Sequence, residues 1–515
     1  MQESRVKKTI LNARVNTICY FLSLFVAFFT RRVFIEHLGT EFLGLSGTLS
    51  SLLGFLNLAE LGVGGSIGYF LYKPLVERDE EKMRQLISLL GYLYRIIGLI
   101  ILAAGVLLAL FLPIIYPDLQ FSLSVVYVGY FAILASSLIG YFCNYKAMLL
   151  WSDQRGYIVT GYFQLTTTIK VILQMVLAIY LTNFILYFVI EFLFGVVNAL
   201  ILHYKVRVTY PWLRTDLSRG RELFRLYPEV WRKVRDIFFH RIGGFVQYQI
   251  MPFFIYGYVS LPMVALYNNY IIITQKMQSL VGGVLGSSSA GVGALIAEGD
   301  IAKIYNAHKE IFALNYFASF FISSSIYYLI SDFIVLWLGS DEYILGESVA
   351  FLICLNLFLS MARGGVDQFI AGYGLFHDVW SPFVESFILL VLSTIFGYFY
   401  GLPGVLLGPV VSLIIVIYLW KPYFLYSQGL HIPFYRYFLL LLQHLVPLVI
   451  SYFVAVQLLS YIPLAFASPW VTWIVKATLF VMFEGLLSFL LLYLVSSAWR
   501  SLLHRFLRHK GYFYN

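Results

Sequence analysis

Charged side chains inside long apolar stretches are the residues of this sequence best suited to chemistry. Each costs about 2.5–3.5 kcal/mol at the centre of a bilayer, so each needs a partner, a cavity or a function. The basic ones are Arg31, Arg32, Arg95, Lys170, Lys276, Arg363 and Lys476. The acidic ones are Glu60, Glu191, Asp367, Glu385 and Glu484. Lysine and arginine pair with phosphate oxygens, and a buried acid can exchange a proton, so the set indicates an anionic ligand and a coupling ion.

The basic residues differ in how easily they reach water. Lys170 and Lys276 lie near the middle of their apolar stretches, one in each half of the chain. They are therefore the best candidates for a cationic cavity. Arg31 and Arg32 either line that cavity or extend to the membrane surface, and the sequence favours neither interpretation.

Four more residues complete the candidate site. Arg363 is the fifth basic candidate, although Asp367 follows it by one helical turn and a local ion pair explains both residues equally well. Glu60 is the first candidate for a coupling carboxylate that binds H⁺ or Na⁺, and Asp367 and Glu191 are the others. A structural hydrogen-bonding role for Glu60 is an equally good interpretation.

Other patterns do not support catalysis or a bound cofactor. The segment Gly64–Gly68 matches a G-x-S-x-G nucleophile motif, but it lies in an apolar stretch, where small residues favour close helix packing. The glycine-rich segment Gly282–Gly293 lacks a G-K-[ST] ending and suits a helix that packs tightly, slides or borders a cavity. The histidines and the three cysteines have no metal-ligand spacing. We expect no metal, no cofactor and no catalytic residue.

The composition places these residues in a membrane protein. Of the 515 residues, 60% are hydrophobic and 12% are charged, about half the usual charge of a soluble chain. This excludes a soluble enzyme, a disordered chain and a nucleic-acid-binding protein. About fourteen apolar segments are each long enough to cross a bilayer. They cover 15–37, 42–70, 87–114, 122–150, 157–181, 184–205, 238–260, 264–297, 309–338, 347–374, 379–400, 402–426, 434–460 and 470–497.

The connections between these segments alternate in charge. Lysine and arginine gather in one set, at 5–14, 73–84, 205–241 and 500–510. The opposite set is acidic or uncharged, with Asp332, Asp341, Glu342 and Glu347 in one connection. The positive-inside rule then predicts an even number of spans and both termini in the cytoplasm.

A short motif repeats in the two halves of the chain. Glu77-x-Asp79-x-x-Lys82 follows the second span, and the same pattern from Glu298 follows the eighth. We therefore predict an all-α fold with two six-helix lobes, related by a pseudo-two-fold axis along the membrane normal, and two C-terminal helices. The expected parts are an N-lobe at 1–206, a basic amphipathic cytoplasmic connector at 207–236, a C-lobe at 237–426, two spans at 427–498 and a basic tail at 499–515.

Two segments carry a resemblance to a known family. Leu58–Gly62 with Tyr69–Leu75, and Ala265–Tyr270 with Ala290–Ala297, resemble the second and eighth spans of Wzx-type polysaccharide repeat-unit flippases. These proteins belong to the multidrug/oligosaccharidyl-lipid/polysaccharide exporter superfamily.

The resemblance implies a flippase in the bacterial inner membrane that serves O-antigen, capsule or lipopolysaccharide synthesis. It would carry an undecaprenyl-diphosphate-linked oligosaccharide to the outer leaflet by alternating access. The diphosphate would bind Arg31, Arg32, Lys170, Lys276 and Arg363, the prenyl tail would stay among membrane lipids, and polysaccharide polymerase machinery would be a partner.

Three alternatives remain open. A multidrug exporter of the same fold would take organic cations, which the excess of basic residues disfavours. A lipid II flippase would need the same kind of cationic cavity, and no residue decides between the two lipids. A polytopic O-antigen polymerase or ligase would need a large outer loop, which the sequence lacks. No residue identifies the glycan.

Overall fold

The apolar stretches fold as helices, because a segment within lipid must satisfy its own backbone hydrogen bonds. A computed structural model describes residues 5–60, 62–117, 119–286, 289–375 and 377–509. Eleven helices in these ranges are long and apolar enough to cross a membrane, and these ranges contain no strand. The predicted all-α, polytopic membrane fold is thus confirmed. The chain forms two compact units, Met1–Ala265 and Leu266–Asn515.

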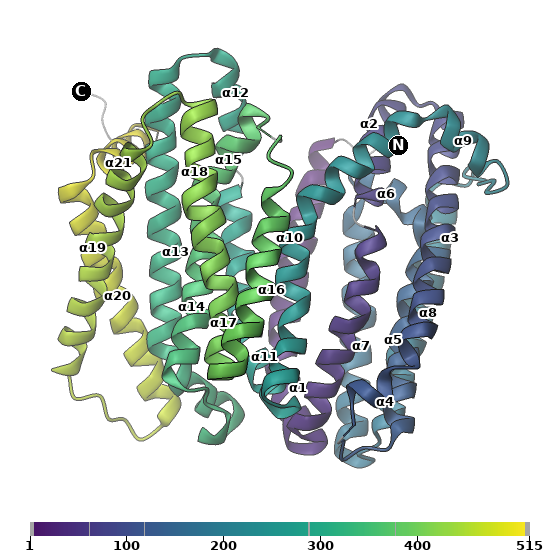
Figure 1. Cartoon of the computed structure of the whole chain (residues 1–515), viewed down its shortest axis with the longest axis horizontal. Helices are drawn as coiled ribbons and strands as arrows, with labels where there is room; N and C mark the ends of the chain where they lie inside the picture. The colour runs from purple at the N-terminus through teal and green to yellow at the C-terminus, as the bar shows by residue number, and fades with distance from the viewer. Residues whose placement is uncertain (1–4, 61, 118, 287–288, 376, 510–515) are drawn as a thin grey trace. The chain divides into compact units, whose positions relative to one another are not determined.

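The first unit, purple to teal in Figure 1, is built around the first helix. Its helices are α1 (Arg5–Leu56), α2 (Val63–Glu77), α3 (Glu80–Ala109), α4 (Leu112–Ile115), α5 (Leu123–Cys143), α6 (Met148–Ser152), α7 (Gly156–Tyr180), α8 (Phe184–Thr209), α9 (Gly220–Leu226) and α10 (Pro228–Tyr258). Helix α1 packs on α7 and α10, and α5 packs on α3 and α8. Helix α11 (Leu261–Leu285) begins in this unit and continues into the second.

A glycine separates the first two expected spans. Gly39 has φ 82° and ψ 160°, so α1 is interrupted there. Only glycine adopts such angles without strain. A short 3₁₀ turn at Asn57–Glu60 then divides the second expected span before α2. The eleven helices are fewer than the fourteen predicted spans because α1 is one helix in that count and α10 and α11 fall outside it.

The second unit, teal to yellow in Figure 1, surrounds its longest helix, α13. Besides the end of α11, its helices are α12 (Ser289–Glu298), α13 (Ile301–Leu338), α14 (Glu347–Ala362), α15 (Gly364–Tyr373), α16 (Ser381–Tyr400), α17 (Leu402–Ser412), α18 (Lys421–Phe424), α19 (Tyr435–Ser460), α20 (Pro469–Val495) and α21 (Ser497–His509). Two π-helical segments, Leu413–Trp420 and Leu425–Gly429, flank α18. The C-terminal helices α19, α20 and α21 all pack on α13.

The repeated acidic motif is a helix start in both units. The carboxylate of Asp79 accepts the backbone N–H of Lys82 at 2.9 Å, and that of Asp300 accepts the N–H of Lys303 at 3.1 Å. The residue before each aspartate, Arg78 or Gly299, has a positive φ. Each aspartate therefore caps the helix that follows, α3 or α13, after a left-handed turn.

A second pair of aspartates also has matching surroundings. Asp153 pairs with Lys8 at 2.6 Å and accepts the hydroxyl of Tyr210 at 2.8 Å. Asp378 pairs with Lys421 at 2.6 Å. In each unit a carboxylate thus ties together segments that are far apart in the sequence.

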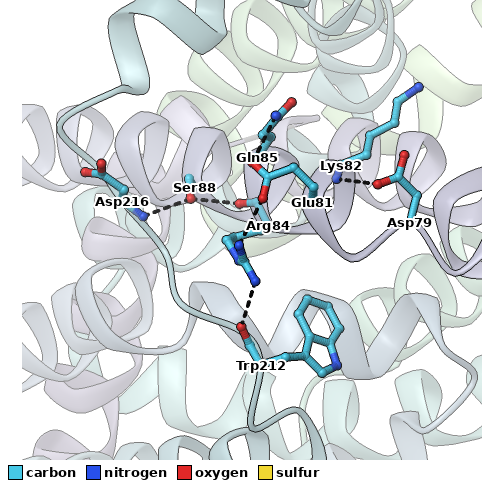
Figure 2. A network of polar contacts seen from close by, with 8 residues as sticks. All are labelled: Asp79, Glu81, Lys82, Arg84, Gln85, Ser88, Trp212 and Asp216. Carbon is cyan, nitrogen blue, oxygen red and sulfur yellow. Dashed lines mark hydrogen bonds and ion pairs between the residues drawn. The ribbon is translucent and has the colours of Figure 1, made fainter.

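The basic connector after α8 is docked on α3 (Figure 2). Arg84 donates to the carbonyl of Trp212 at 3.3 Å, and the N–H of Asp216 donates to the hydroxyl of Ser88 at 3.0 Å. A Cβ on Gly220 would lie 2.1 Å from the ring of Tyr92, so only glycine fits there. Between 207 and 236 the helical parts are the end of α8, the short α9 and the start of α10.

The C-terminal tail is helical as far as His509. The carboxylate of Glu310 on α13 accepts the hydroxyl of Ser501 at 2.6 Å and pairs with Arg505 at 3.1 Å. The ring of Trp499 lies 4.9 Å from that of Phe317. Helix α21 is therefore fixed to α13, and the rest of the tail, 510–515, lies outside the described residues.

Candidate functional site

The first unit contains an ion pair between two apolar helices. Nζ of Lys170 on α7 lies 2.6 Å from Oε1 of Glu191 on α8. Gln174, one turn after Lys170, donates to Oε2 of Glu191 at 3.2 Å and to the carbonyl of Tyr187 at 3.1 Å. Lysine and amide therefore hold the carboxylate from two sides. The pair offsets part of the cost of placing either charge within the membrane.

Arg31 belongs to the same polar centre. Its guanidinium donates to the carbonyl of Ala265 at 2.9 Å. Tyr187 interacts electrostatically with both Arg31 and Glu191. Tyr187 thus links Arg31 to the ion pair of Lys170 and Glu191. We call these residues, with Gln174, the N-terminal polar centre.

Arg32 is oriented differently from its neighbour. It pairs with Glu36 at 2.7 Å, one turn along α1, and both side chains are exposed. Successive residues on a helix project about 100° apart, so Arg31 and Arg32 lie on different faces.

Glu60 lies at a third place in the first unit. Its carboxylate accepts the hydroxyl of Tyr94 on α3 at 2.5 Å. The nearby amide of Asn57 accepts hydroxyls from Ser137 and Tyr141 at 3.0 and 2.9 Å. The Tyr94 and Tyr141 rings are 5.4 Å apart, so the 3₁₀ turn carrying Glu60 is joined to α3 and α5 by a tyrosine cluster.

The second unit contains a cavity of about 300 Å³ between α11, α13, α14 and α15. Its lining is Gln278, Val281, Gly282, Leu285, Gly286, Asn315, Ser360, Met361, Arg363, Gly364, Asp367 and Gln368. Two glycines of the segment Gly282–Gly293 thus border a cavity, one of the roles expected of that segment. Residues 287 and 288 of it lie outside the described residues.

Arg363 and Asp367 form the ion pair that their spacing predicts. Nε of Arg363 lies 2.6 Å from Oδ2 of Asp367. Glu385 of α16 is buried and interacts electrostatically with both. Gln368 donates to the carbonyl of Leu285 at 3.2 Å and so fixes α15 to α11. We call Arg363, Asp367 and Glu385 the C-terminal polar centre.

Lys276 does not line the cavity. The α11 residues that do are spaced at 278, 281, 282, 285 and 286, which is one helical face. At about 100° per residue, Lys276 projects from the other side of α11. The five predicted basic residues therefore divide, with Arg31 and Lys170 in one centre, Arg363 in the other, and Arg32 and Lys276 in neither.

The remaining sequence motifs carry no visible chemistry. The Ser66 hydroxyl is buried and donates to the carbonyl of Gly62 at 2.7 Å, within its own helix. The cysteines Cys19, Cys143 and Cys354 are free. Within the described ranges no group of His, Cys, Asp and Glu could hold a metal ion. Leu61, part of one resemblance motif, lies outside those ranges.

The sequence analysis missed the amides that complete both centres. Gln174, Gln278, Asn315 and Gln368 all lie in apolar stretches. These amides could have been recognised in the same way as the charged residues, since a polar side chain within an apolar stretch needs a hydrogen-bond partner.

Solved structures share this architecture, although no protein-family model matches the chain and no curated protein matches it either. The matching structures include transporters of the MOP superfamily. An inward-facing MATE multidrug resistance transporter of that superfamily is 16% identical, with a TM-score of 0.60, over 80% of this chain and 95% of that one. A MOP transporter from Pyrococcus furiosus, described as having a binding pocket of reversed polarity, is 16% identical, with a TM-score of 0.50, over 83% and 97%.

One structure in this group is a lipid flippase. The lipid II flippase MurJ, in an inward closed conformation, is 15% identical, with a TM-score of 0.58, over 92% of this chain and 97% of that one. At these identities the likeness establishes the fold. The chain is a multi-pass membrane protein with the fold of MOP-superfamily transporters.

Proposed function

We propose that this protein is a flippase, not an enzyme, that moves an undecaprenyl-diphosphate-linked oligosaccharide from the cytoplasmic to the outer leaflet by alternating access. It acts in the bacterial inner membrane with both termini in the cytoplasm, and polysaccharide polymerase machinery uses its product. An ion gradient of H⁺ or Na⁺ drives the cycle.

The observation that carries the proposal is the pair of basic side chains in the N-terminal polar centre. Arg31 interacts electrostatically with Tyr187, which also interacts with Glu191, the partner of Lys170. A diphosphate supplies negative charge to both basic groups. It also offers several oxygens to an ammonium group and a planar guanidinium. Arg32, Lys276 and Arg363 stay in the proposed set as residues that the substrate meets during the cycle.

The fold likeness supports a lipid-linked substrate. The flippase match extends over 92% of the chain, whereas the multidrug match covers 80%. The flippase therefore accounts for more of this chain. The choice between the oligosaccharide and lipid II rests on the resemblance of Leu58–Gly62 and Ala265–Tyr270 to repeat-unit flippases.

The C-terminal polar centre suits the coupling ion. This centre contains one basic residue, Arg363, and two acids, Asp367 and Glu385. A second basic residue near Glu385, Lys421, pairs with Asp378. An acidic excess attracts a cation, so Asp367 is a coupling candidate beside Glu60 and Glu191. The same excess supports the second candidate function, export of organic cations.

The test is reconstitution in liposomes with a labelled undecaprenyl-diphosphate oligosaccharide, followed by the rate at which the sugar becomes accessible across the bilayer. We expect acceleration by the wild type, at least a tenfold loss in Lys170→Ala or Arg31→Ala, and partial recovery in Arg31→Lys. Lys476→Ala is the matched control, because Lys476 also pairs with an acid, Asp332 at 2.5 Å, but belongs to the appended helix α20.

Two results would reject the proposal. Acceleration of lipid II alone would move the assignment to that lipid. Efflux of an organic cation from the same vesicles, without oligosaccharide movement, would make the protein a multidrug exporter.

A further inference from the structure

The appended helix α20 contains a fully buried acid, Glu484, with 0% exposure. One turn before it lies Phe480, which stacks on Tyr328 of α13 at 4.2 Å between ring centres. One turn after it lies Ser488, whose hydroxyl contacts that of Ser451 on α19 at 2.6 Å. Glu484 therefore lies between α13 and α19. Figure 1 shows α13, α19 and α20 as neighbouring helices.

Two serine hydroxyls of α13 contact the two carboxyl oxygens. Ser324 contacts Oε1, and Ser325 contacts Oε2 at 3.0 Å. Ser324 also lies 2.6 Å from the carbonyl oxygen of Phe320, one turn earlier on α13. These groups form a continuous polar chain inside an apolar cluster.

The hydroxyl groups are the donors along this chain. A hydroxyl has a single proton to donate, and a carbonyl oxygen can only accept. Ser324 donates to Oε1 and also lies within hydrogen-bond distance of the carbonyl of Phe320, and Ser325 donates to Oε2. Both carboxyl oxygens are therefore bonded by neutral hydroxyl groups.

An ionised Glu484 would be a buried negative charge with hydroxyl partners and no cation. Within the described ranges no Lys or Arg side chain bonds to its carboxyl group. Lys476, the basic residue of α20 itself, pairs with Asp332, and Lys303 of α13 pairs with Asp300. A buried carboxylate without a cation is costly, whereas a neutral acid with its hydrogen bonds made is not.

The titratable groups near this cluster on α13 and α19 are tyrosines and one histidine. Tyr452 of α19 interacts with Glu484, and Tyr328 stacks on Phe480. His444 of α19 contacts the carbonyl of Leu440 at 2.8 Å and the hydroxyl of Ser496 at 3.0 Å, so its own ring nitrogens are occupied. Among the described residues, the carboxyl oxygens of Glu484 bond to Ser324 and Ser325 and to none of these groups.

We propose that Glu484 is a proton-binding site that holds the appended pair α19–α20 on α13, and that its ionisation loosens α20. The ligand is a proton rather than a sodium ion, because the carboxyl and serine oxygens are in hydrogen-bond contact and leave no space for an ion between them. The site is separate from both polar centres and does not depend on which substrate is carried.

Infrared difference spectroscopy of the full-length protein in nanodiscs tests the proton directly. We expect wild type minus Glu484→Gln at neutral pH to show the C=O stretching band of one carboxylic acid. Ser324→Ala should shift that band, because the carboxyl group loses its hydrogen bond with the Ser324 hydroxyl. Glu347→Gln, an exposed acid at the start of α14, is the matched control and should remove no such band.

The pH dependence of thermal stability tests whether ionisation of Glu484 loosens the packing of α20. The folded state holds a proton that the unfolded state releases at neutral pH, so stability should fall as the pH rises. We expect Tm to fall from mildly acidic to mildly alkaline pH by several degrees more in wild type than in Glu484→Gln. Glu484→Asp serves where the glutamine variant does not fold. The proposal is overturned if the carboxylic-acid band is missing, if a carboxylate band responds to Na⁺ instead, or if both proteins show the same pH slope.

Discussion

The ammonium group of Lys170 on α7 lies 2.6 Å from the carboxylate of Glu191 on α8. The pair explains how a lysine near mid-membrane is tolerated. An anionic ligand that binds Lys170 must therefore either displace Glu191 or bind beside it.

Breaking this pair should destabilise the first unit. Lys170→Ala leaves Glu191 with the amide of Gln174 as its remaining hydrogen-bond donor, at a cost of about 2 kcal/mol, because a charged group loses its partner in a poorly solvated place. Thermal unfolding in detergent measures the loss. The double variant Lys170→Met/Glu191→Gln should recover most of the stability without recovering transport. An additive double variant would contradict the pairing.

Glu60→Gln should remove the part of the transport rate that a pH gradient drives, if Glu60 is the coupling acid. The amide keeps a contact with Tyr94 but cannot exchange a proton. Transport with and without an imposed gradient in liposomes gives the answer. Tyr94→Phe, which removes the hydrogen bond alone, should slow transport while keeping its response to the gradient. An unchanged gradient response in Glu60→Gln would assign coupling to another acid.

Filling the cavity of the second unit should block transport without unfolding the protein. No described atom lies within 4 Å of the place where Gly282 would carry a Cβ, so Gly282→Leu can be accommodated by the cavity itself. We expect Tm to stay within a few degrees and the transport rate to fall at least fivefold. Gly299→Leu, which alters the turn before α13, is the contrasting variant. It should lower Tm instead, because Gly299 has φ 76°. Normal transport in Gly282→Leu would separate the cavity from the substrate path.

The two N-caps should behave alike. Asp79→Ala and Asp300→Ala each remove one side-chain bond to a helix N-terminus and should cost about 1 kcal/mol. Asparagine at either position should recover most of the loss, because it keeps the acceptor oxygen. Thermal unfolding compares the four variants. An Asp300 variant without effect would show that only the first copy of the motif acts as a cap.

The docked connector should loosen at low pH. The hydroxyl and the N–H of Ser218 donate to Asp216 and lower the pKa of its carboxyl group. The folded-state pKa is then below the unfolded value, so this contribution is present at neutral pH and lost as the pH falls through the acidic range. A spin label at Arg214→Cys, in a background without the native cysteines, should become more mobile on acidification. In Asp216→Asn the mobility should be independent of pH over the same range.

The sequence by itself determined the class of fold. Apolar length and the rarity of charge require helices within a membrane, because lipid offers no partner to an open backbone. The recurrence of Asp79 and Asp300 indicated two related halves, and each proved to be a helix cap. The spacing of Arg363 and Asp367 was enough to predict their ion pair, because residues four apart share a helix face.

Tertiary structure alone decided how the other charges are grouped. Whether Arg31 or Arg32 joins Lys170 depends on the rotation of α1, and whether Lys276 reaches the cavity depends on the rotation of α11. Both α1 and α11 carry apolar residues on all of their faces. Their sequences therefore say little about which face turns toward the other helices. Partners such as Glu191 for Lys170 and Ser324 for Glu484 come from other helices, and only the packing of those helices brings them into contact.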